Sequence, residues 1–491
     1  MRCRMKKLNF LWYCTDQQRF DTIGALGNHY LKTPNIDRLV REGVTFMRTY
    51  SQSPLCTPSR AAFLTGRYPK SVRSSINGNA QFSRDETLVT KMLRDKGDYT
   101  CGLVGKLHLT SSYKRMETRT DDGYSYMQWS HMPIDNWAPG INKYQDWLKA
   151  KGVEWSEVYK SPCPTWPPKH GYPLPERIQG MTEENHQTTW CSEKAIEFIE
   201  SAKEKGPWCA SVNVYAPHPP FDPPESYKER LKIEDMPLPL YREGELDNKP
   251  FAHKDCYLNG SQNGMLRDTV GMTDMEKREV TRDYYAQVEL IDTQLGRLID
   301  YLEETGQREN TVIIFHSDHG EMLGDHGIYF KGGYFYEGLV HVPLVISCPG
   351  TILQDVRSNA LVELLDLTPT VLDLAGLPIP EYIQGKSFAP ILTGEAPPND
   401  HKDCVYSEYY FSAMSLHEIH ATMYFDGRYK IAVHHNSDIS ELYDLENDPC
   451  EYENLWNKDG YEKLQNELVK KCFDHAVLCN TDRVMGRISN Y

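Results

Sequence analysis

Several features that would assign a sequence to a class at once are missing from these 491 residues. There is no apolar run of membrane-spanning length, no internal repeat and no low-complexity tract. The formal net charge of −15 argues against a nucleic-acid partner, because a protein that binds a phosphate backbone needs a basic face. With 40% hydrophobic and 25% charged residues, the composition is that of a globular protein. We therefore expect neither a nucleic-acid nor a membrane partner.

The cysteines indicate the compartment. There are 13 of them, an odd number, and no C-x-x-C pair. This usage indicates reduced thiols in a cytosol rather than a disulfide framework. The basic N-terminus, residues 1–7, precedes a short apolar stretch that runs into Asp16 without a small-residue cleavage site, so we interpret it as a first strand and not as a signal peptide. The sequence thus predicts a cytoplasmic, bacterial protein.

Hydrophobic runs that end in Asp, Gly or His alternate with helical segments along most of the chain. The helical segments include residues 36–42, 87–96 and 188–203. This alternation predicts an α/β fold with a large central, mostly parallel mixed sheet and helices on both faces. Apolar residues at helical spacing predict a long amphipathic helix over 281–305. Short strands near the end predict a smaller α+β subdomain with an antiparallel sheet and a helix, so we divide the chain into domains 1–398 and 399–491.

Two of the predicted strands end in residues that can bind a cation. The run 8–15 is followed by Asp16 and Gln17, and the run 311–316 leads to Asp318 and His319. Open α/β sheets place ligands just past the carboxyl ends of their strands. Carboxylate oxygens suit a hard divalent cation, which near a dianionic ester neutralises charge and acts as a Lewis acid.

The most distinctive pattern is Cys56-Thr57-Pro58-Ser59-Arg60. Taken alone, it is also compatible with a buried structural cysteine and a solvated arginine. A cysteine phosphatase is a poor match, because its loop needs a more distant arginine to close around phosphate than Arg60, four positions on. The segment resembles the C-x-P-S-R signature of type I sulfatases, members of the alkaline phosphatase superfamily. In that family the cysteine is oxidised to Cα-formylglycine.

Further segments match this family in the same order. Lys106 and His108 lie in a G-K-x-H segment, which lacks the glycine spacing and the Ser or Thr of a Walker phosphate loop. His218 lies between prolines, as in the family's P-H-x-P segment. Lys331 lies 12 residues after His319, which resembles the spacing in the choline sulfatase branch of the family. Asn77 is a weaker candidate for a substrate-facing amide, because Asn-Gly is first a turn signal. The end of the chain, 441–455, resembles the close of sulfatase C-terminal subdomains, so the resemblance covers about 8–455.

The resemblance implies an alkaline phosphatase-like fold and a divalent metal ion. The implied ligands are Asp16, Gln17, Cys56 as formylglycine, Asp318 and His319. Ca²⁺ is the family default. Gln17 and His319 depart from the residues of many arylsulfatases and match choline sulfatases and phosphonate monoester hydrolases. An imidazole ligand keeps Mn²⁺ or another transition ion open.

The resemblance also implies a mechanism. Hydrated formylglycine at position 56, held against the metal and Arg60, attacks sulfur, and His218 or Lys331 stabilises or protonates the departing alcohol. Lys106 and His108 hold one hydroxyl, and His108 accepts the proton whose loss expels sulfate. The implied catalytic residues are Cys56, Arg60, Lys106, His108, His218 and Lys331. The implied substrate contacts are Asn77, His218 and Lys331.

Three functions are compatible with the sequence. A sulfatase acting on a small-molecule or saccharide sulfate ester, matured by a formylglycine-generating or radical maturase, is favoured by Lys106 and His108. A phosphonate monoester or phosphodiester hydrolase on the same fold is favoured by Gln17, His319 and Asn77. A non-catalytic sulfate-ester binding protein would leave Cys56 unoxidised. The aromatic region 124–166 could stack on a sugar, surround a quaternary ammonium or serve as packing. The sequence also allows a homo-oligomer.

Overall fold

Two separate β-sheets organise the protein. A computed structural model describes residues 7–112, 115–132, 137–154, 181–260, 269–411 and 418–479. The strands of the large sheet are β1 (Asn9–Asp16), β2 (Gly43–Tyr50), β3 (Thr100–Gly105), β4 (Tyr124–Trp129), β5 (Trp208–Pro217), β6 (Thr311–Ser317), β7 (Leu344–Ser347) and β8 (Val356–Glu363). The strands of the small sheet are β9 (Val405–Tyr409), β10 (His420–Phe425), β11 (Tyr429–His435) and β12 (Glu441–Asp444).

The large sheet has the strand order β4-β3-β5-β1-β6-β7-β2-β8. Its strands run in one direction except β7, which pairs antiparallel with both β6 and β2. The small sheet has the order β12-β11-β10-β9 and is antiparallel throughout. The expected α/β architecture with a mostly parallel mixed sheet and a separate C-terminal antiparallel sheet is confirmed.

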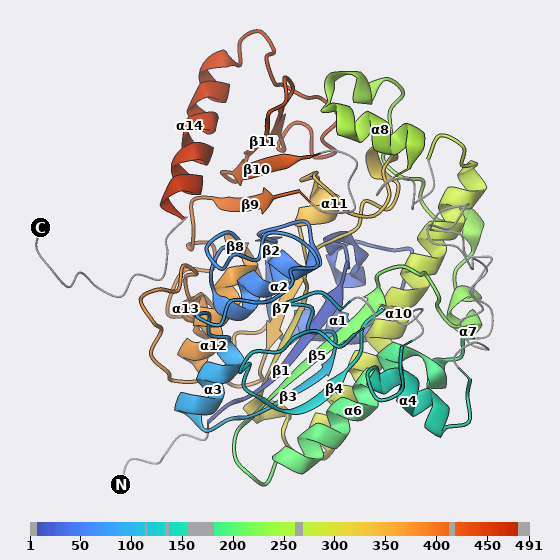
Figure 1. The fold of residues 1–491 in the computed structure, drawn as a ribbon, viewed down its shortest axis with the longest axis vertical. Helices are drawn as coiled ribbons and strands as arrows, with labels where there is room; N and C mark the ends of the chain where they lie inside the picture. The colour runs from blue at the N-terminus through green and yellow to red at the C-terminus, as the bar shows by residue number, and fades with distance from the viewer. Residues whose placement is uncertain are drawn as a thin grey trace, which may run out of the picture.

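Helices cover both faces of the large sheet (Figure 1). The α-helices are α1 (Pro34–Arg41), α2 (Cys56–Thr65), α3 (Val89–Gly97), α4 (Lys143–Ala150), α6 (Gln187–Ala202), α7 (Glu225–Lys228), α8 (Phe251–Asn259), α10 (Asp274–Glu304), α11 (Glu337–Val340), α12 (Leu367–Leu374), α13 (Ala389–Thr393) and α14 (Glu462–Leu478). The 3-10 helices are η1 (Phe20–Thr22), η2 (Gly24–Leu26), η4 (Glu183–Asn185), η5 (Ile233–Asp235), η6 (Glu245–Asn248), η7 (Arg308–Asn310), η8 (Asp325–Gly327) and η9 (Leu364–Asp366).

The alternation of side chains along β1 explains the two helical layers. Phe10 and Trp12 point into a core shared with α2, α3, α12 and α13, whereas Leu11 and Tyr13 point into a core shared with α1, α4, α6 and α10. All of β1 is buried, because a central parallel strand is covered on both faces. The strand is therefore a rigid support for the residues that follow Asp16.

The predicted long helix is present but begins earlier than expected. α10 starts at Asp274 rather than at residue 281 and spans 31 residues. Its first turns are mainly polar, and Met275 is exposed, so they carry no apolar periodicity. Thr273 and Glu276 start the helix instead with a reciprocal capping box.

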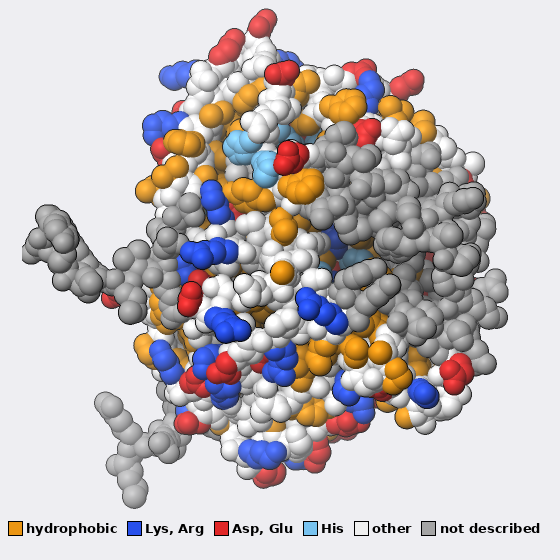
Figure 2. All heavy atoms as spheres, viewed as in Figure 1, with side chains coloured by type: hydrophobic (Ala, Val, Ile, Leu, Met, Phe, Trp, Pro, Cys, Tyr) orange, Lys and Arg blue, Asp and Glu red, His pale blue; other side chains and the backbone are white. Residues whose placement is uncertain are grey.

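Other predictions from composition can be compared with the described residues. Each cysteine among them is a free thiol, as expected from the cysteine pattern. None of their helices combines the length and the apolar character needed to cross a bilayer. Lys and Arg side chains are scattered over the face drawn in Figure 2, with Asp and Glu between them. The domain boundary after residue 398 stays a prediction.

Candidate active site

The candidate site lies where β1 and β6 end side by side. The parallel register pairs Thr15 with Ser317, so the residues that follow each strand meet at one edge of the sheet. The backbone N–H of Gln17 donates to Asp318 Oδ1 at 3.0 Å, and Gln17 itself has a left-handed φ of 73°. This turn brings the two pairs predicted from the sequence, Asp16 with Gln17 and Asp318 with His319, together in one buried place.

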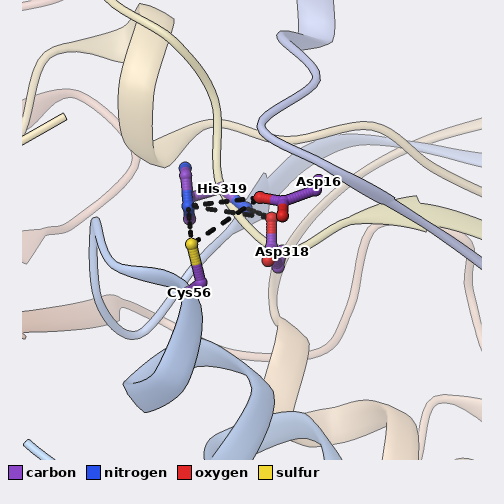
Figure 3. A group of neighbouring side chains, drawn as sticks. All are labelled: Asp16, Cys56, Asp318 and His319. Atoms are coloured by element: carbon purple, nitrogen blue, oxygen red, sulfur yellow. Dashed lines mark hydrogen bonds and ion pairs between the residues drawn. The ribbon is translucent and has the colours of Figure 1, made fainter. Parts of the chain in front are cut away.

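Cys56 is the first residue of α2, and its side chain points at the ends of the two strands (Figure 3). Its Sγ lies 3.2 Å from His319 Nε2 and 3.6 Å from Asp16 Oδ1. One ligand atom from each of Asp16, Cys56, Asp318 and His319 lies within 4.8 Å of the others. These four buried side chains can therefore contact one ion.

The spacing of the Cys56 to Arg60 segment is explained by the helix it forms. Residues at i, i+3 and i+4 share one helical face, so Cys56, Ser59 and Arg60 all point toward the strand ends. Arg60 Nε donates to Asp318 Oδ2 at 2.8 Å, and Ser59 Oγ donates to the Asp318 carbonyl oxygen at 2.6 Å. Arg60 also donates to the Lys106 carbonyl oxygen at 3.0 Å, which ties the helix to the segment after β3.

Two lysines supply positive charge around Cys56. Lys331 Nζ lies 2.7 Å from Cys56 Sγ and 2.9 Å from Gln17 Oε1, and Lys106 Nζ forms an ion pair with Asp16. Burial and Asp16 favour the neutral thiol, but Lys106, Lys331 and His319 outweigh them and lower the pKa of Cys56. The environment thus favours negative charge at the position of the sulfur.

His108 is held by its backbone rather than by its ring. Its φ is 57°, and its amide N–H donates to the buried carboxylate of Glu117 at 2.7 Å. The ring packs edge-on against His131 at 4.6 Å, and Nδ1 has no hydrogen-bond partner. Burial, with Lys106 and His131 nearby, holds the pKa of His108 well below its ordinary value. The imidazole is therefore neutral near pH 7 and can accept a proton.

His218 follows β5 and belongs to the same group of charges. Its ring contacts Tyr215 at 4.6 Å and Phe330 at 5.2 Å between centroids. Nδ1 lies 2.7 Å from the Pro219 carbonyl oxygen, which can only accept, so Nδ1 carries the proton. Burial first, and then Lys331, hold the pKa of His218 well below its ordinary value.

The residues at the strand ends fit a divalent cation. His319 Nδ1 lies 2.8 Å from the Gly320 carbonyl oxygen and must donate to it, so Nε2, on the side of Cys56, is the nitrogen that would bind an ion once the imidazole has lost its second proton. The Gln17 side-chain nitrogen donates to Glu321, which leaves Gln17 Oε1 as an acceptor on the side of Lys331. Two carboxylates, an amide oxygen and one imidazole are a donor set suited to Ca²⁺ or Mn²⁺.

Comparisons with known proteins decide the family. Residues 8–377 match the family described as Sulfatase, and residues 324–477 match the one described as N-sulphoglucosamine sulphohydrolase, C-terminal. The chain belongs to the sulfatase family. It is therefore a sulfuric ester hydrolase, an enzyme that cleaves sulfate esters, and the hypothesis of a non-catalytic binding protein is dropped.

Individual relatives cover nearly the whole sulfatase chain. An arylsulfatase of Clostridium perfringens is 29% identical over 477 residues, which cover 94% of this chain and 93% of that protein. An N-acetylglucosamine-6-O-sulfatase of Bacteroides thetaiotaomicron is 27% identical over 518 residues, covering 95% and 85%. A solved phosphonate monoester hydrolase of Agrobacterium radiobacter shares the fold, with a TM-score of 0.82, 24% identity and 96% coverage of each chain.

Asn77 contacts the backbone of α2 in this sulfatase, whereas the predicted metal ligands lie at the strand ends and on Cys56. Its Oδ1 accepts the backbone N–H of Thr57 at 3.0 Å, at the first turn of α2. The helix begins at Cys56, so Asn77 satisfies one of the free N–H groups next to the candidate nucleophile.

The described tryptophans of the aromatic region serve packing. Trp129 and Trp137 are buried in the core and contact each other edge-on, while Trp147 packs against Tyr144 and lies under the Lys151 ammonium. Residues 155 and 166 lie outside the described residues.

Sequence reasoning missed three groups that support the site. Glu117 accepts the backbone N–H groups of His108, Leu109 and Thr110, and no motif marks it. His131 contacts the ring of His108, and Glu321 holds the side chain of Gln17. Glu321 lies close to His319 in sequence, which is the one local signal that could have identified it.

Proposed function

We propose that this sulfatase hydrolyses a sulfate monoester of a small molecule or saccharide, with formylglycine made from Cys56 as its nucleophile. The observation that carries the proposal is the position of Cys56 Sγ, with Lys331 Nζ at 2.7 Å and His319 Nε2 at 3.2 Å. In the mature enzyme, formylglycine oxygens would take the place of this sulfur. A formylglycine-generating or radical maturase would act on Cys56 before the site is complete.

The metal in this proposal is held by Asp16, Gln17, the residue at position 56, Asp318 and His319. When bound, a divalent cation neutralises charge on the sulfate group and polarises its S–O bonds. The oxygen-rich donor set supports Ca²⁺, and the imidazole of His319 keeps Mn²⁺ as the alternative.

The other residues act on protons and charge. Lys106, Lys331 and Arg60 concentrate positive charge where a dianionic group would bind, in a buried site where such charges are weakly screened. The hydrated aldehyde supplies two hydroxyls, one to attack sulfur and one whose deprotonation releases sulfate. Neutral His108 is the base for that deprotonation, because the low pKa of its ring leaves the imidazole unprotonated.

Lys331 is the better candidate to protonate the departing alcohol. The proton of neutral His218 is engaged at Nδ1 with the Pro219 carbonyl oxygen, so its Nε2 can accept but not donate. Lys331 carries three N–H donors and lies beside the nucleophile position. We therefore assign sulfate binding to His218 and proton donation to Lys331, and Asn77 to holding the first turn of α2.

A saccharide substrate is supported by the relative that is named an N-acetylglucosamine-6-O-sulfatase. The alternative, a phosphonate monoester hydrolase, is supported by Gln17 and His319 and by the fold shared with the Agrobacterium radiobacter enzyme. The cytoplasmic location and a homo-oligomer stay predictions.

The test is a comparison of kcat/KM for an aryl sulfate and an aryl phosphonate monoester. The protein used must show, by peptide mass, that Cys56 has become formylglycine. We expect the sulfate to be the faster substrate, after which a panel of sulfated sugars and choline sulfate defines the leaving group. Faster turnover of the phosphonate would replace the proposal with the alternative.

A further inference from the structure

A second group of metal-binding side chains lies outside the active site. It consists of His253 on α8, His434 on β11 and Glu441 at the start of β12. All three are buried, and one ligand atom from each lies within 4.8 Å of the others. The group joins a helix of the large domain to the C-terminal sheet, and it shares no residue with the group around Cys56.

Glu441 is the centre of this group. Its Oε2 lies 2.9 Å from His434 Nε2, and its Oε1 lies 3.8 Å from His253 Nδ1. Tyr443 donates its hydroxyl to Glu441 Oε1 at 2.6 Å, and the Tyr336 hydroxyl lies 3.1 Å from His253 Nδ1. Tyr443 thus fixes the carboxylate of Glu441, and Tyr336 engages Nδ1 of His253, which leaves Nε2 as the nitrogen of that ring without a hydrogen bond.

One nitrogen of the group has no partner. His253 is fully buried, and its Nε2 makes no hydrogen bond in the described structure. A buried polar atom without a partner costs free energy, and most such atoms in folded proteins are satisfied. The hydrogen bonds among these residues therefore do not account for both nitrogens of His253.

Lys249 is a buried cation beside this group, with its ammonium 4.8 Å from the centre of the Tyr336 ring and 5.5 Å from that of Tyr443. Its Nζ lies 3.6 Å from Glu245 Oε2 and donates to the Glu451 carbonyl oxygen at 2.9 Å. Glu245 is its ion-pair partner, and the carboxylate of Glu441 also favours its charge, so an ion bound at Glu441 would share that carboxylate with Lys249.

We propose that His253, His434 and Glu441 form a second metal site that binds Zn²⁺ or a similar transition-metal ion and fastens α8 to the C-terminal sheet. Two imidazoles and one carboxylate form a donor set that Zn²⁺ accepts, with solvent completing the coordination. Binding replaces the hydrogen bond between His434 and Glu441, so the proton on His434 Nε2 moves to Nδ1. Because His253 contacts Tyr334 and Tyr336, the ion also stiffens the segment that begins with Lys331.

The experiment uses full-length protein in which Cys56→Ser keeps sulfur away from the first site. The protein is stripped with a chelator and titrated with Co²⁺, whose visible absorption reports coordination geometry, and bound metal is counted by mass spectrometry. We expect about two bound Co²⁺ ions per chain in this protein and about one after His434→Ala or Glu441→Gln. The same two changes should remove the visible absorption band of a four-coordinate Co²⁺ ion. His435→Ala, which changes the exposed neighbour of His434, is the matched control and should keep both equivalents.

A His319→Ala change in the same Cys56→Ser protein weakens the first metal site and should leave the Co²⁺ absorption band of the second site unchanged. If that band is absent from this protein, or if His434→Ala and Glu441→Gln leave the metal count unchanged, the second site does not exist. Circular dichroism of each stripped variant confirms that it is folded, and His434→Gln replaces any variant that is not. The outcome does not depend on formylglycine or on the choice of sulfate ester, so the two proposals fail separately.

Discussion

Glu117 Oε1 accepts the backbone N–H of His108 at 2.7 Å, and this bond connects a buried carboxylate to the candidate base. The other carboxylate oxygen accepts the N–H groups of Leu109 and Thr110, and the indole of Trp129 donates to Oε1 at 2.8 Å. Four donors converge on one side chain. Since the His108 backbone has a left-handed φ, this carboxylate holds it in a conformation that most residues avoid.

Replacing Glu117 by Gln should reduce kcat much more than it changes KM. A glutamine keeps one acceptor but turns an N–H₂ group toward the backbone donors, so His108 moves away from its position. A misplacement of about 1 Å at a catalytic group costs about a hundredfold in rate. Steady-state kinetics on an aryl sulfate measure the effect.

The control for Glu117 is another buried carboxylate, Glu86, which pairs with Arg67 at 2.7 Å. Glu86→Gln should lower the melting temperature but leave kcat near the wild-type value. Equal losses of kcat in both variants would mean that Glu117 acts only through stability.

Cys56→Ser and Cys56→Ala should both abolish turnover. Serine would form a sulfate ester with no second hydroxyl to expel it, and alanine has no nucleophile. Product release measured over many turnovers, together with the mass of the peptide containing residue 56, checks the prediction. A full rate in either variant would contradict the mechanism.

Asp318→Asn should lower the free energy of unfolding and weaken metal binding together. The change leaves Arg60 buried without its carboxylate, and breaking a buried ion pair in this way costs about 3–5 kcal/mol. Urea denaturation and metal analysis measure the two effects. Asp21→Asn is a suitable comparison, because its partner is also an arginine, Arg19, but the Asp21 side chain is 55% exposed and should matter by about 1 kcal/mol or less.

The buried carboxyl of Glu408 should make the protein less stable as pH rises. Burial is the main cause that raises its pKa from 4.5 to about 7, so the folded state binds a proton that the unfolded state releases. The contribution of Glu408 to the free energy of unfolding is fully present below about pH 4.5 and is lost as pH rises through about 7. The loss in the free energy of unfolding is on the order of 3 kcal/mol at most. Glu408→Gln should flatten this fall in melting temperature between pH 5 and 8. The exposed Glu395→Gln should not.

The sequence predicts those parts of the site that depend on local pattern. Asp16 and Asp318 follow apolar runs, and Cys56 and Arg60 are related by one helical turn, so strand ends and helix periodicity are enough to place them. The fold class follows in the same way from alternating strands and helices.

The remaining features depend on long-range packing. No sequence pattern near Glu117 predicts that its carboxylate accepts the backbone N–H of His108. None near His253 predicts that His434, on a strand of the C-terminal sheet, lies beside it. The start of α10 was missed because its first turns are polar, and a cap rather than a periodic pattern defines it. Strand order is also set by packing, which a single sequence does not display.

The reversed direction of β7 has a consequence for how this enzyme can vary. A chain that leaves one strand can enter an antiparallel neighbour at the same edge of the sheet. To enter a parallel neighbour, it must first cross to the opposite edge. The chain between β6 and β7 therefore stays on the ligand-binding edge, and it carries His319 near its start and Lys331 further along. The segment between those two residues is buried against the site, so substitutions within it would change the lining of the site while the order and direction of the strands stay the same.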